Sequence, residues 1–223
     1  YRRQRQMCIR DRIGTDTGSV TTITSGGLTK DNTLSLSGTV SDASGVSSVQ
    51  IYDGATLLGS ATVSSGNWTY TTSALSDGSH SFTAVATDLA GNVTTTSAVT
   101  ATVDATAPLF SSVTTSGTGI TSGSGYIKAG SVVTFTVNAS ENVIVSGGPP
   151  TLTLSDGGVA TYTGGTGTNA LTFSYTVGAG DTSSDLSVTA FNANGATLKD
   201  SAGNVTVTSG AVTNPSGTLV VDT

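Results

Sequence analysis

Residues 171–177 read LTFSYTV, a strict alternation of large apolar side chains with threonine and serine. The apolar residues occupy the odd positions, so they all fall on one side of an extended chain. This period of two is typical of an antiparallel strand with one buried face. Residues 33–40 and 133–137 alternate in the same way. The pattern therefore predicts an all-β chain.

Turn signals separate these alternating runs. Pairs such as Asp-Gly, Asn-Gly and Ser-Gly, which favour tight turns, occur at 53–54, 65–66, 77–78, 156–157 and 194–195. Between the turns we predict strands over 19–23, 33–41, 46–52, 55–63, 66–72, 79–87 and 93–103, then over 109–114, 131–138, 142–146, 151–155, 158–163, 170–177, 186–191 and, with interruptions, 205–221. About seven short strands at this spacing favour a β-sandwich.

One phrase occurs twice in the chain. Residues 88–93 read DLAGNV and residues 200–205 read DSAGNV, and each copy leads into a Thr- and Val-rich stretch that ends in Val-Asp. Such repetition indicates tandem modules. We predict two tandem immunoglobulin-like β-sandwiches, residues 13–106 and 107–223, each near the ~100 residues usual for that fold. We also expect the chain to be a fragment of a longer array.

The first twelve residues differ in composition from the rest. They contain all five arginines, the only cysteine and the only methionine. Residues 6–12 read QMCIRDR, which resembles translated sequencing-adapter read-through at the ends of metagenomic fragments. We therefore interpret residues 1–12 as a non-native segment that contributes nothing to the fold. The alternative is a native basic arm that binds nucleic acid or an anionic surface.

Charge and composition exclude several classes of function. Without residues 1–12 the chain keeps 3 basic and 13 acidic residues, a net charge of −10, with no arginine and no cysteine. Such a chain offers no basic surface to nucleic acid and no disulfide. Small extracellular modules without disulfides often rely on metal. No apolar run approaches the ~20 residues of a membrane helix, so we expect no membrane insertion.

Further stretches carry a family resemblance. Residues 103–108 read VDATAP, residues 135–143 read FTVNASENV, and residues 160–186 begin ATYTGG and end in Leu186. Together with the repeated phrase they resemble bacterial immunoglobulin-like repeats of large secreted and surface proteins. The resemblance covers residues 13–223. It implies stalk or display modules of adhesins, often stiffened by calcium, and it departs from antibodies in lacking the cysteine pair and the tryptophan between them.

The side-chain inventory opposes catalysis. His80, the only histidine, lies in phase with Phe82 and Ala84, so we expect it in the core or at its rim. There is no Gly-x-Ser-x-Gly elbow between a strand and a helix, and no His/Cys cluster that could bind zinc. We predict no catalytic residues, no organic cofactor and no enzyme activity.

Two aromatic residues share one face of a predicted strand. Trp68 and Tyr70 are in phase, with Thr69 between them on the other face. We expect both to pack in the sandwich core. The alternative is a platform on which a sugar ring stacks.

The acidic residues give the stronger signal. All but one of the 13 are aspartates, the residue of turns and calcium loops. In a sandwich of this topology two loops and the incoming linker meet at one end. This predicts two oxygen-only sets of ligands, Asp104, Glu141, Asp200 and Asn204 for the second unit and Asp16, Asp42, Asp88 and Asn92 for the first. A structural calcium ion and capping of each local turn both remain open.

These observations favour a structural function. We expect non-catalytic spacer or display repeats of a bacterial cell-surface or secreted adhesin, stiffened by calcium, with neighbouring repeats as partners and a host-cell or biofilm surface reached through other domains. Weak adhesion by the repeats themselves stays open. The main alternative is an accessory carbohydrate-binding or linker module of a secreted polysaccharide-active enzyme. A phage tail decoration domain fits the fold but not the adhesin-like repeat ending.

Overall fold

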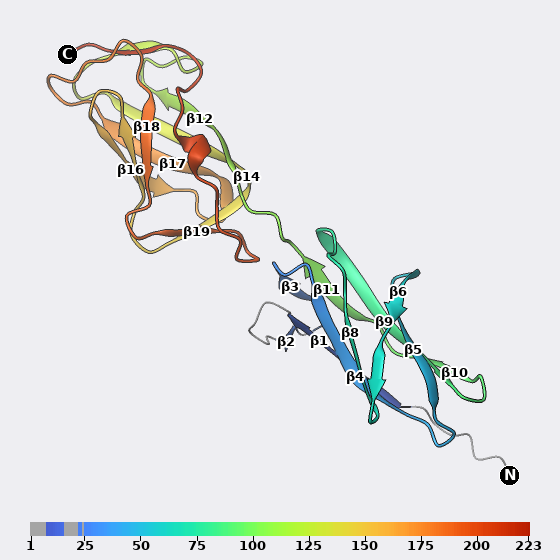
Figure 1. Ribbon diagram of the computed structural model, residues 1–223. Helices are drawn as coiled ribbons and strands as arrows, with labels where there is room; N and C mark the ends of the chain where they lie inside the picture. Colours follow the sequence, from blue (N-terminus) through green and yellow to red (C-terminus); the bar gives the residue numbers. More distant parts are fainter. Residues whose placement is uncertain (1–7, 16–21, 24) are drawn as a thin grey trace. The chain divides into compact units, whose positions relative to one another are not determined.

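The computed structural model describes residues 8–15, 22–23 and 25–223. The chain divides into two compact units, Tyr1–Thr106 and Ala107–Thr223. Apart from one 3-10 turn, η1 (Ser209–Ala211), the regular structure in the described residues consists of β-strands (Figure 1). The prediction of an all-β fold is confirmed.

The first unit contains two sheets. One has the strand order β2-β1-β4-β8-β7 and is built from β1 (Cys8–Thr15), β2 (Thr22–Ile23), β4 (Leu34–Ser41), β7 (Thr62–Ser64) and β8 (Asn67–Thr71). The other has the order β3-β11-β9-β5-β6, with β10 on β9. Its strands are β3 (Gly27–Thr29), β5 (Val46–Asp53), β6 (Thr56–Ser60), β9 (Gly78–Asp88), β10 (Val93–Thr95) and β11 (Val99–Val103).

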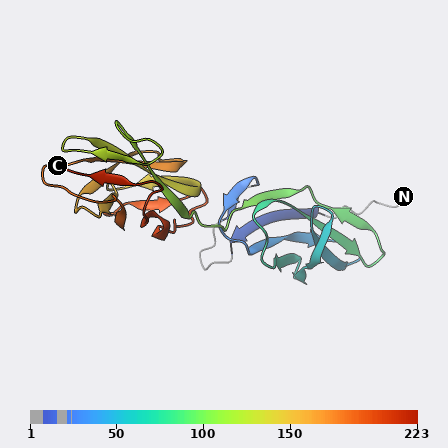
Figure 2. The same cartoon turned by 90° about the horizontal axis from the view of Figure 1, so that it is seen from above.

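Apolar residues from the two sheets pack against each other in the first unit. The alternation predicted for residues 33–41 appears in β4, where Leu34, Leu36 and Val40 are buried. They share one core cluster with Trp68 of β8 and with Phe82 of β9. Burial of one face of each sheet is what period-two sequences favour, and the result is a sandwich (Figure 2).

The structure differs from the sequence prediction at the N-terminus. Residues 8–12 belong to β1, which pairs antiparallel with β4 from Cys8–Ser41 to Thr15–Leu34 without a register shift. The prediction that residues 1–12 contribute nothing to the fold is therefore wrong for residues 8–12. It rested on the unusual composition of residues 1–12 and on the adapter-like stretch 6–12, but ladder pairing uses backbone N–H and C=O groups that almost any sequence supplies.

The second unit has one large sheet and one short parallel pair. The sheet has the order β12-β14-β17-β16-β15-β18, with β19 on β14, and contains β12 (Phe110–Gly117), β14 (Val132–Ser146), β15 (Thr151–Leu154), β16 (Val159–Gly164), β17 (Thr168–Thr176), β18 (Val188–Asn192) and β19 (Thr197–Lys199). The pair joins β13 (Gly125–Ile127) to β20 (Leu219–Val221). Residues of both pack in one cluster that includes Phe135, Phe173 and Leu219.

Three predicted strands of the second unit take a different form. Residues 131–138 and 142–146 are one continuous strand, β14, whose pairing with β17 shifts register between Asn138 and Val143. Residues 205–221 hold only the short β20 and the turn η1. Gly210 lies in η1, where a Cβ would lie 1.7 Å from the carbonyl oxygen of Phe110, so only glycine allows the backbone to approach β12 this closely.

Both units close in the same way. A short early strand pairs in parallel with the last strand, β3 with β11 in the first unit and β13 with β20 in the second. The aspartate after the last strand then donates its backbone N–H to the end of the early strand, Asp104 to Thr29 at 2.9 Å and Asp222 to Ile127 at 3.0 Å. In both units the repeated Val-Asp ending therefore marks the end of the last strand and its final hydrogen bond to the early strand.

Candidate functional site

The phrase that occurs twice in the sequence folds into the same turn twice. In the first unit Asp88 Oδ1 accepts the backbone N–H of Asn92 at 2.8 Å, and Asp88 Oδ2 accepts the Asn92 side-chain amide at 2.6 Å. In the second unit Asp200 and Asn204 make the same two bonds at 2.9 and 2.7 Å. The residue before each asparagine is a glycine with φ near +90°, a conformation that side chains disfavour.

These bonds satisfy the aspartates within their own turns. Asp88 also accepts the backbone N–H of Ala90, and hydrogen bonds from Asn92 lower the pKa of Asp88. Asp42, of the same predicted set, accepts the backbone N–H of Ser44 at 2.6 Å. Local turn capping, the alternative to calcium, thus accounts for the geometry of Asp42, Asp88 and Asn92. Asp16 lies outside the described residues.

The second unit brings two predicted ligands together. Glu141 comes from β14 and Asp200 from the turn after β19, and carboxylate oxygens of the two lie within 4.8 Å of each other. Asp200 is only 5% exposed and already holds the Asn204 amide. The carboxylates of Glu141 and Asp200 supply the hard oxygen atoms that calcium prefers, so they fit such an ion, whereas Asn204 turns its amide nitrogen toward Asp200.

Asp104 belongs to the first unit by its contacts but lies close to the second along the chain. Its N–H is bonded to Thr29 of the first unit. Five residues later Leu109 donates its N–H to Ser140 Oγ, next to Glu141. An extended chain spans about 3.3–3.6 Å per residue, which keeps the Asp104 backbone within about 18 Å of Leu109.

The segment that joins the units is bonded on both sides. Asp77, in the loop before β9, accepts the Ala105 N–H at 2.7 Å and the Thr106 hydroxyl. The hydrogen bond from the Thr106 hydroxyl, and to a smaller extent the bond from the Ala105 N–H, lower the pKa of Asp77. In the second unit, the Pro108 carbonyl accepts the Val207 N–H at 2.8 Å. The sequence does not reveal this role, because an Asp-Gly pair such as Asp77-Gly78 indicates only a turn.

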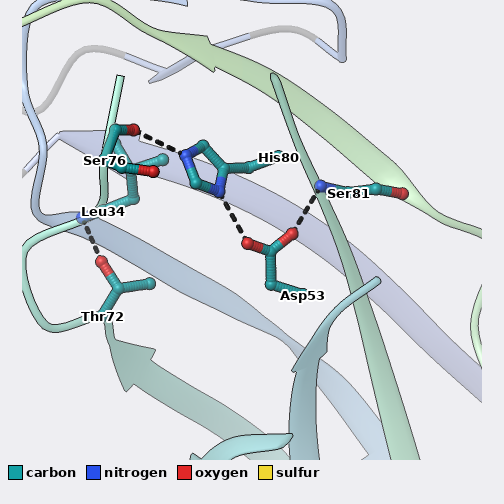
Figure 3. A network of polar contacts seen from close by, with 6 residues as sticks. All are labelled: Leu34, Asp53, Thr72, Ser76, His80 and Ser81. Carbon is teal, nitrogen blue, oxygen red and sulfur yellow. Dashed lines mark hydrogen bonds and ion pairs between the residues drawn. The ribbon is translucent and has the colours of Figure 1, made fainter. Parts of the chain in front are cut away.

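His80 of the first unit has a polar partner at each of its two ring nitrogens (Figure 3). Its Nδ1 lies 2.6 Å from Asp53 Oδ2, and its Nε2 lies 2.9 Å from the carbonyl oxygen of Ser76. The ring is 8% exposed and stacks on Phe82, as predicted for a rim residue. Because Nε2 contacts a main-chain carbonyl, this His–Asp pair does not present a hydroxyl nucleophile of the kind used in acyl transfer.

The predicted aromatic pair does not form a sugar platform. Trp68 is 2% exposed in the core, and Tyr70 is half-buried with its hydroxyl donating to the Leu58 carbonyl at 2.8 Å. Among the described aromatic residues the exposed one is Tyr126 of β13, at 83%. Sequence reasoning did not single it out, because residues 125–127 follow a Gly/Ser-rich loop and give no alternation long enough to place them on a strand.

The family of the first unit follows from a direct match. Residues 6–105 match the family model of the bacterial Ig-like domain. The first unit is a bacterial immunoglobulin-like domain. The match begins at residue 6, so the region shared with the family includes β1. Bacterial immunoglobulin-like domains are typically non-catalytic. Within the described residues no helix has the length and apolar character to cross a bilayer.

Solved structures resemble the bacterial immunoglobulin-like domain and its neighbour only distantly. The fibronectin(III)-like modules of Clostridium thermocellum CbhA share 20% identity over 42% of this chain and 97% of that chain, with a TM-score of 0.33. Bacteroides ovatus SGBP-B of a mixed-linkage glucan utilization locus, in complex with a mixed-linkage heptasaccharide, shares 16% identity over 96% of this chain and 60% of that chain, with a TM-score of 0.19. No curated protein matches the chain. At these values the likeness carries no functional argument.

Proposed function

We propose that this chain is a non-catalytic spacer of a bacterial cell-surface or secreted adhesin, in which neighbouring repeats hold a distal binding domain away from the cell. The observation that carries the proposal is the hydrogen-bonded joint. The last residue of the first unit, Thr106, is hydrogen-bonded to Asp77 of that unit, and Pro108, the second residue of the second unit, is hydrogen-bonded to Val207 of that unit. A spacer transmits position only if its joints resist bending, and long unbonded linkers leave domains free to move.

The joint has few free torsions. Ala107 is the residue between the two bonded stretches, and the following proline restricts it to extended conformations. Pro108 itself has a fixed φ. The first and second units therefore support a short connector whose stiffness comes from Asp77 on one side and from the Pro108–Val207 bond on the other.

Calcium is the second part of this proposal. A calcium ion held by Glu141 and Asp200, with Asn204 and with Asp104 from the preceding unit, would tie the connector to the second unit. Carboxylates held close together repel one another unless a cation joins them. Extracellular modules bind calcium with Kd of about 0.1–1 mM, so at tenfold excess over Kd the ion would stabilise by about 1.4 kcal/mol. That is small for a domain but large for one joint.

Calorimetry tests the ion directly. Titration of calcium into the full chain should give a heat that Glu141→Gln and Asp104→Ala each remove, while Asp42→Asn in the first unit leaves it unchanged. Unchanged heat in both Glu141→Gln and Asp104→Ala would place any calcium elsewhere and end this part of the proposal.

Small-angle scattering tests the spacer. In calcium the profile should correspond to a narrow range of conformations, and chelator or Asp104→Ala should broaden it without a comparable change in the melting of either unit. Identical profiles with calcium and with chelator, together with no calorimetric heat, would leave a spacer that does not use metal. A broad profile in every condition would contradict the spacer itself.

An accessory carbohydrate-binding module of a secreted enzyme is the second candidate function. The aromatic pair first considered for it is unsuitable, because Trp68 lies in the core. What favours it now is the exposure of Tyr126 in the second unit, on a different strand and face from those predicted.

A further inference from the structure

Tyr126 occupies an unusual position for an aromatic side chain. It is 83% exposed, whereas the other described tyrosines, phenylalanines and the tryptophan are buried or half-buried. Its neighbour Ile127 points into the core and is 3% exposed, so the alternation of β13 forces Tyr126 outward. A single large exposed aromatic ring is a common anchor in binding sites, because it offers a broad apolar face at a low entropic cost.

The strand that carries Tyr126 is held rigidly. The preceding loop closes on itself through two bonds between Thr121 and Ser124, at 2.8 and 3.0 Å. Gly125 N–H donates to the Thr218 carbonyl at 3.0 Å. A Cβ at Gly125 would lie 2.2 Å from the Gly119 carbonyl oxygen, so glycine is required for this close approach. A ligand at Tyr126 would therefore meet a preorganised surface.

A hollow of about 660 Å³ lies beside the ring. The hollow is open to solvent, so a ligand there would lie on the surface of the second unit rather than be enclosed. Besides Tyr126, its wall includes the half-exposed Val132 and four polar side chains, Thr118, Lys128, Ser131 and Asp222. The site thus combines one aromatic face with a rim of hydrogen-bond donors and acceptors. It carries one cation and one anion, so its side chains have no net charge.

We propose that this hollow binds a neutral carbohydrate, with a sugar ring stacked on Tyr126 and its hydroxyl groups bonded to the polar rim. A sugar ring has an apolar face of C–H groups and an edge of hydroxyls, which matches an aromatic surface beside mixed donors and acceptors. A charged ligand would be attracted by one of Lys128 and Asp222 and repelled by the other, so this pair gives neither an anion nor a cation a net electrostatic advantage. This inference rests on the second candidate function, the carbohydrate-binding module, and names its binding site. It does not depend on the proposal that the chain is a spacer.

The test uses the full chain and defined oligosaccharides. Cellohexaose, mannohexaose and xylohexaose serve as neutral probes, with hexagalacturonate and a chitosan hexamer as the charged ones. Binding is followed by calorimetry and by the NMR shifts of the tyrosine rings. At least one neutral probe should bind and shift the Tyr126 signals. Tyr126→Ala should weaken that binding about tenfold or more, because the stacking surface is lost, whereas Tyr126→Phe should retain most of it.

Controls separate binding from folding and from the spacer. Leu28 occupies the same place on β3 that Tyr126 occupies on β13 and is 43% exposed, so Leu28→Ala should leave binding unchanged. Tyr126→Ala should melt like the wild type, because the ring packs little in the fold. No binding of any neutral probe, binding only of charged probes, or binding that survives Tyr126→Ala would each overturn the proposal. None of these outcomes alters the scattering that tests the spacer.

Discussion

At the scale of single residues, His80 has an environment that suits its charged form. Burial of the ring opposes protonation, but the bond to Asp53, the bond to the Ser76 carbonyl and the charge of Asp53 together outweigh it, and the pKa of His80 is raised. Both partners of the ring are acceptors. A neutral imidazole has one N–H and can satisfy only one of them, whereas the imidazolium donates to both.

This predicts a pH dependence of folding. Because the folded state binds the proton more tightly than the unfolded chain, the stabilisation is fully present below the ordinary value of 6.5 and is lost as the pH rises through the raised value. Urea unfolding of the first unit across this range should show stability falling with pH. Asp53→Asn should flatten that part of the curve, and a wild-type curve that rises with pH there would refute the assignment.

Truncation of Trp68 should strongly destabilise the first unit. Its side chain is 2% exposed in the core of the first unit, so Trp68→Ala should lower the free energy of unfolding by about 3–5 kcal/mol. Trp68→Phe should cost less, because it keeps most of the volume and removes an indole N–H that has no hydrogen-bond partner. Denaturant titration measures both. Near wild-type stability of Trp68→Ala would mean that the ring is not in the core.

At the scale of elements, the repeated turn shows what a local pattern can predict. The spacing of Asp88 and Asn92, which recurs in Asp200 and Asn204, gave a capped turn as one of two interpretations, beside calcium binding, because those side chains bond to nearby backbone. The pairing of strands that are distant in the sequence is harder to predict from a local pattern. Residues 8–12 lack alternation and yet pair along β4, and β13 is too short for a period to be visible. Their partners come from distant segments that a local pattern cannot specify.

The turns give a matched pair of variants. Asp200→Ala removes the acceptor of two backbone N–H groups and of the Asn204 amide, and leaving such donors unpaired should lower the stability of the second unit by about 1–3 kcal/mol. Asp88→Ala should destabilise the first unit in the same direction. Melting followed separately for each unit is the measurement. A loss confined to the unaltered unit would contradict this account of the turn.

Strand β1 gives a second test at this scale. Deleting residues 1–12 removes five of the eight β1 residues paired with β4, so the thermal midpoint of the first unit should fall. Deleting residues 1–7, which leaves β1 whole, is the matched control and should have a smaller effect. Equal midpoints for the wild type and both deletions would restore the interpretation of this segment as foreign to the fold.

At the scale of the whole molecule, the proposed spacer function depends on the segment that joins the two units. The sequence indicated two modules and placed Asp104, Glu141 and Asp200 near the boundary, because the ends of strands in a sandwich gather its loops. It did not indicate Asp77, which reaches Ala105 and Thr106 across about thirty residues of chain through a tertiary contact. The calcium ligands remain a prediction. The hydrogen bonds of Asp77 in the first unit and of Pro108 in the second, which leave little of the connector unbonded, are part of the fold of each unit.

The central claim is that this connector restrains the two units as a spacer. Spin labels at Thr69 in β8 and Asn169 in β17, both exposed strand positions, with Cys8 replaced by serine, allow the distribution of distances between the units to be measured by pulsed electron resonance. In calcium the wild type should give one narrow distribution, and Asp77→Ala and chelator should each widen it. A wild-type distribution in calcium as broad as that of a chain with an inserted Gly/Ser linker would contradict the account.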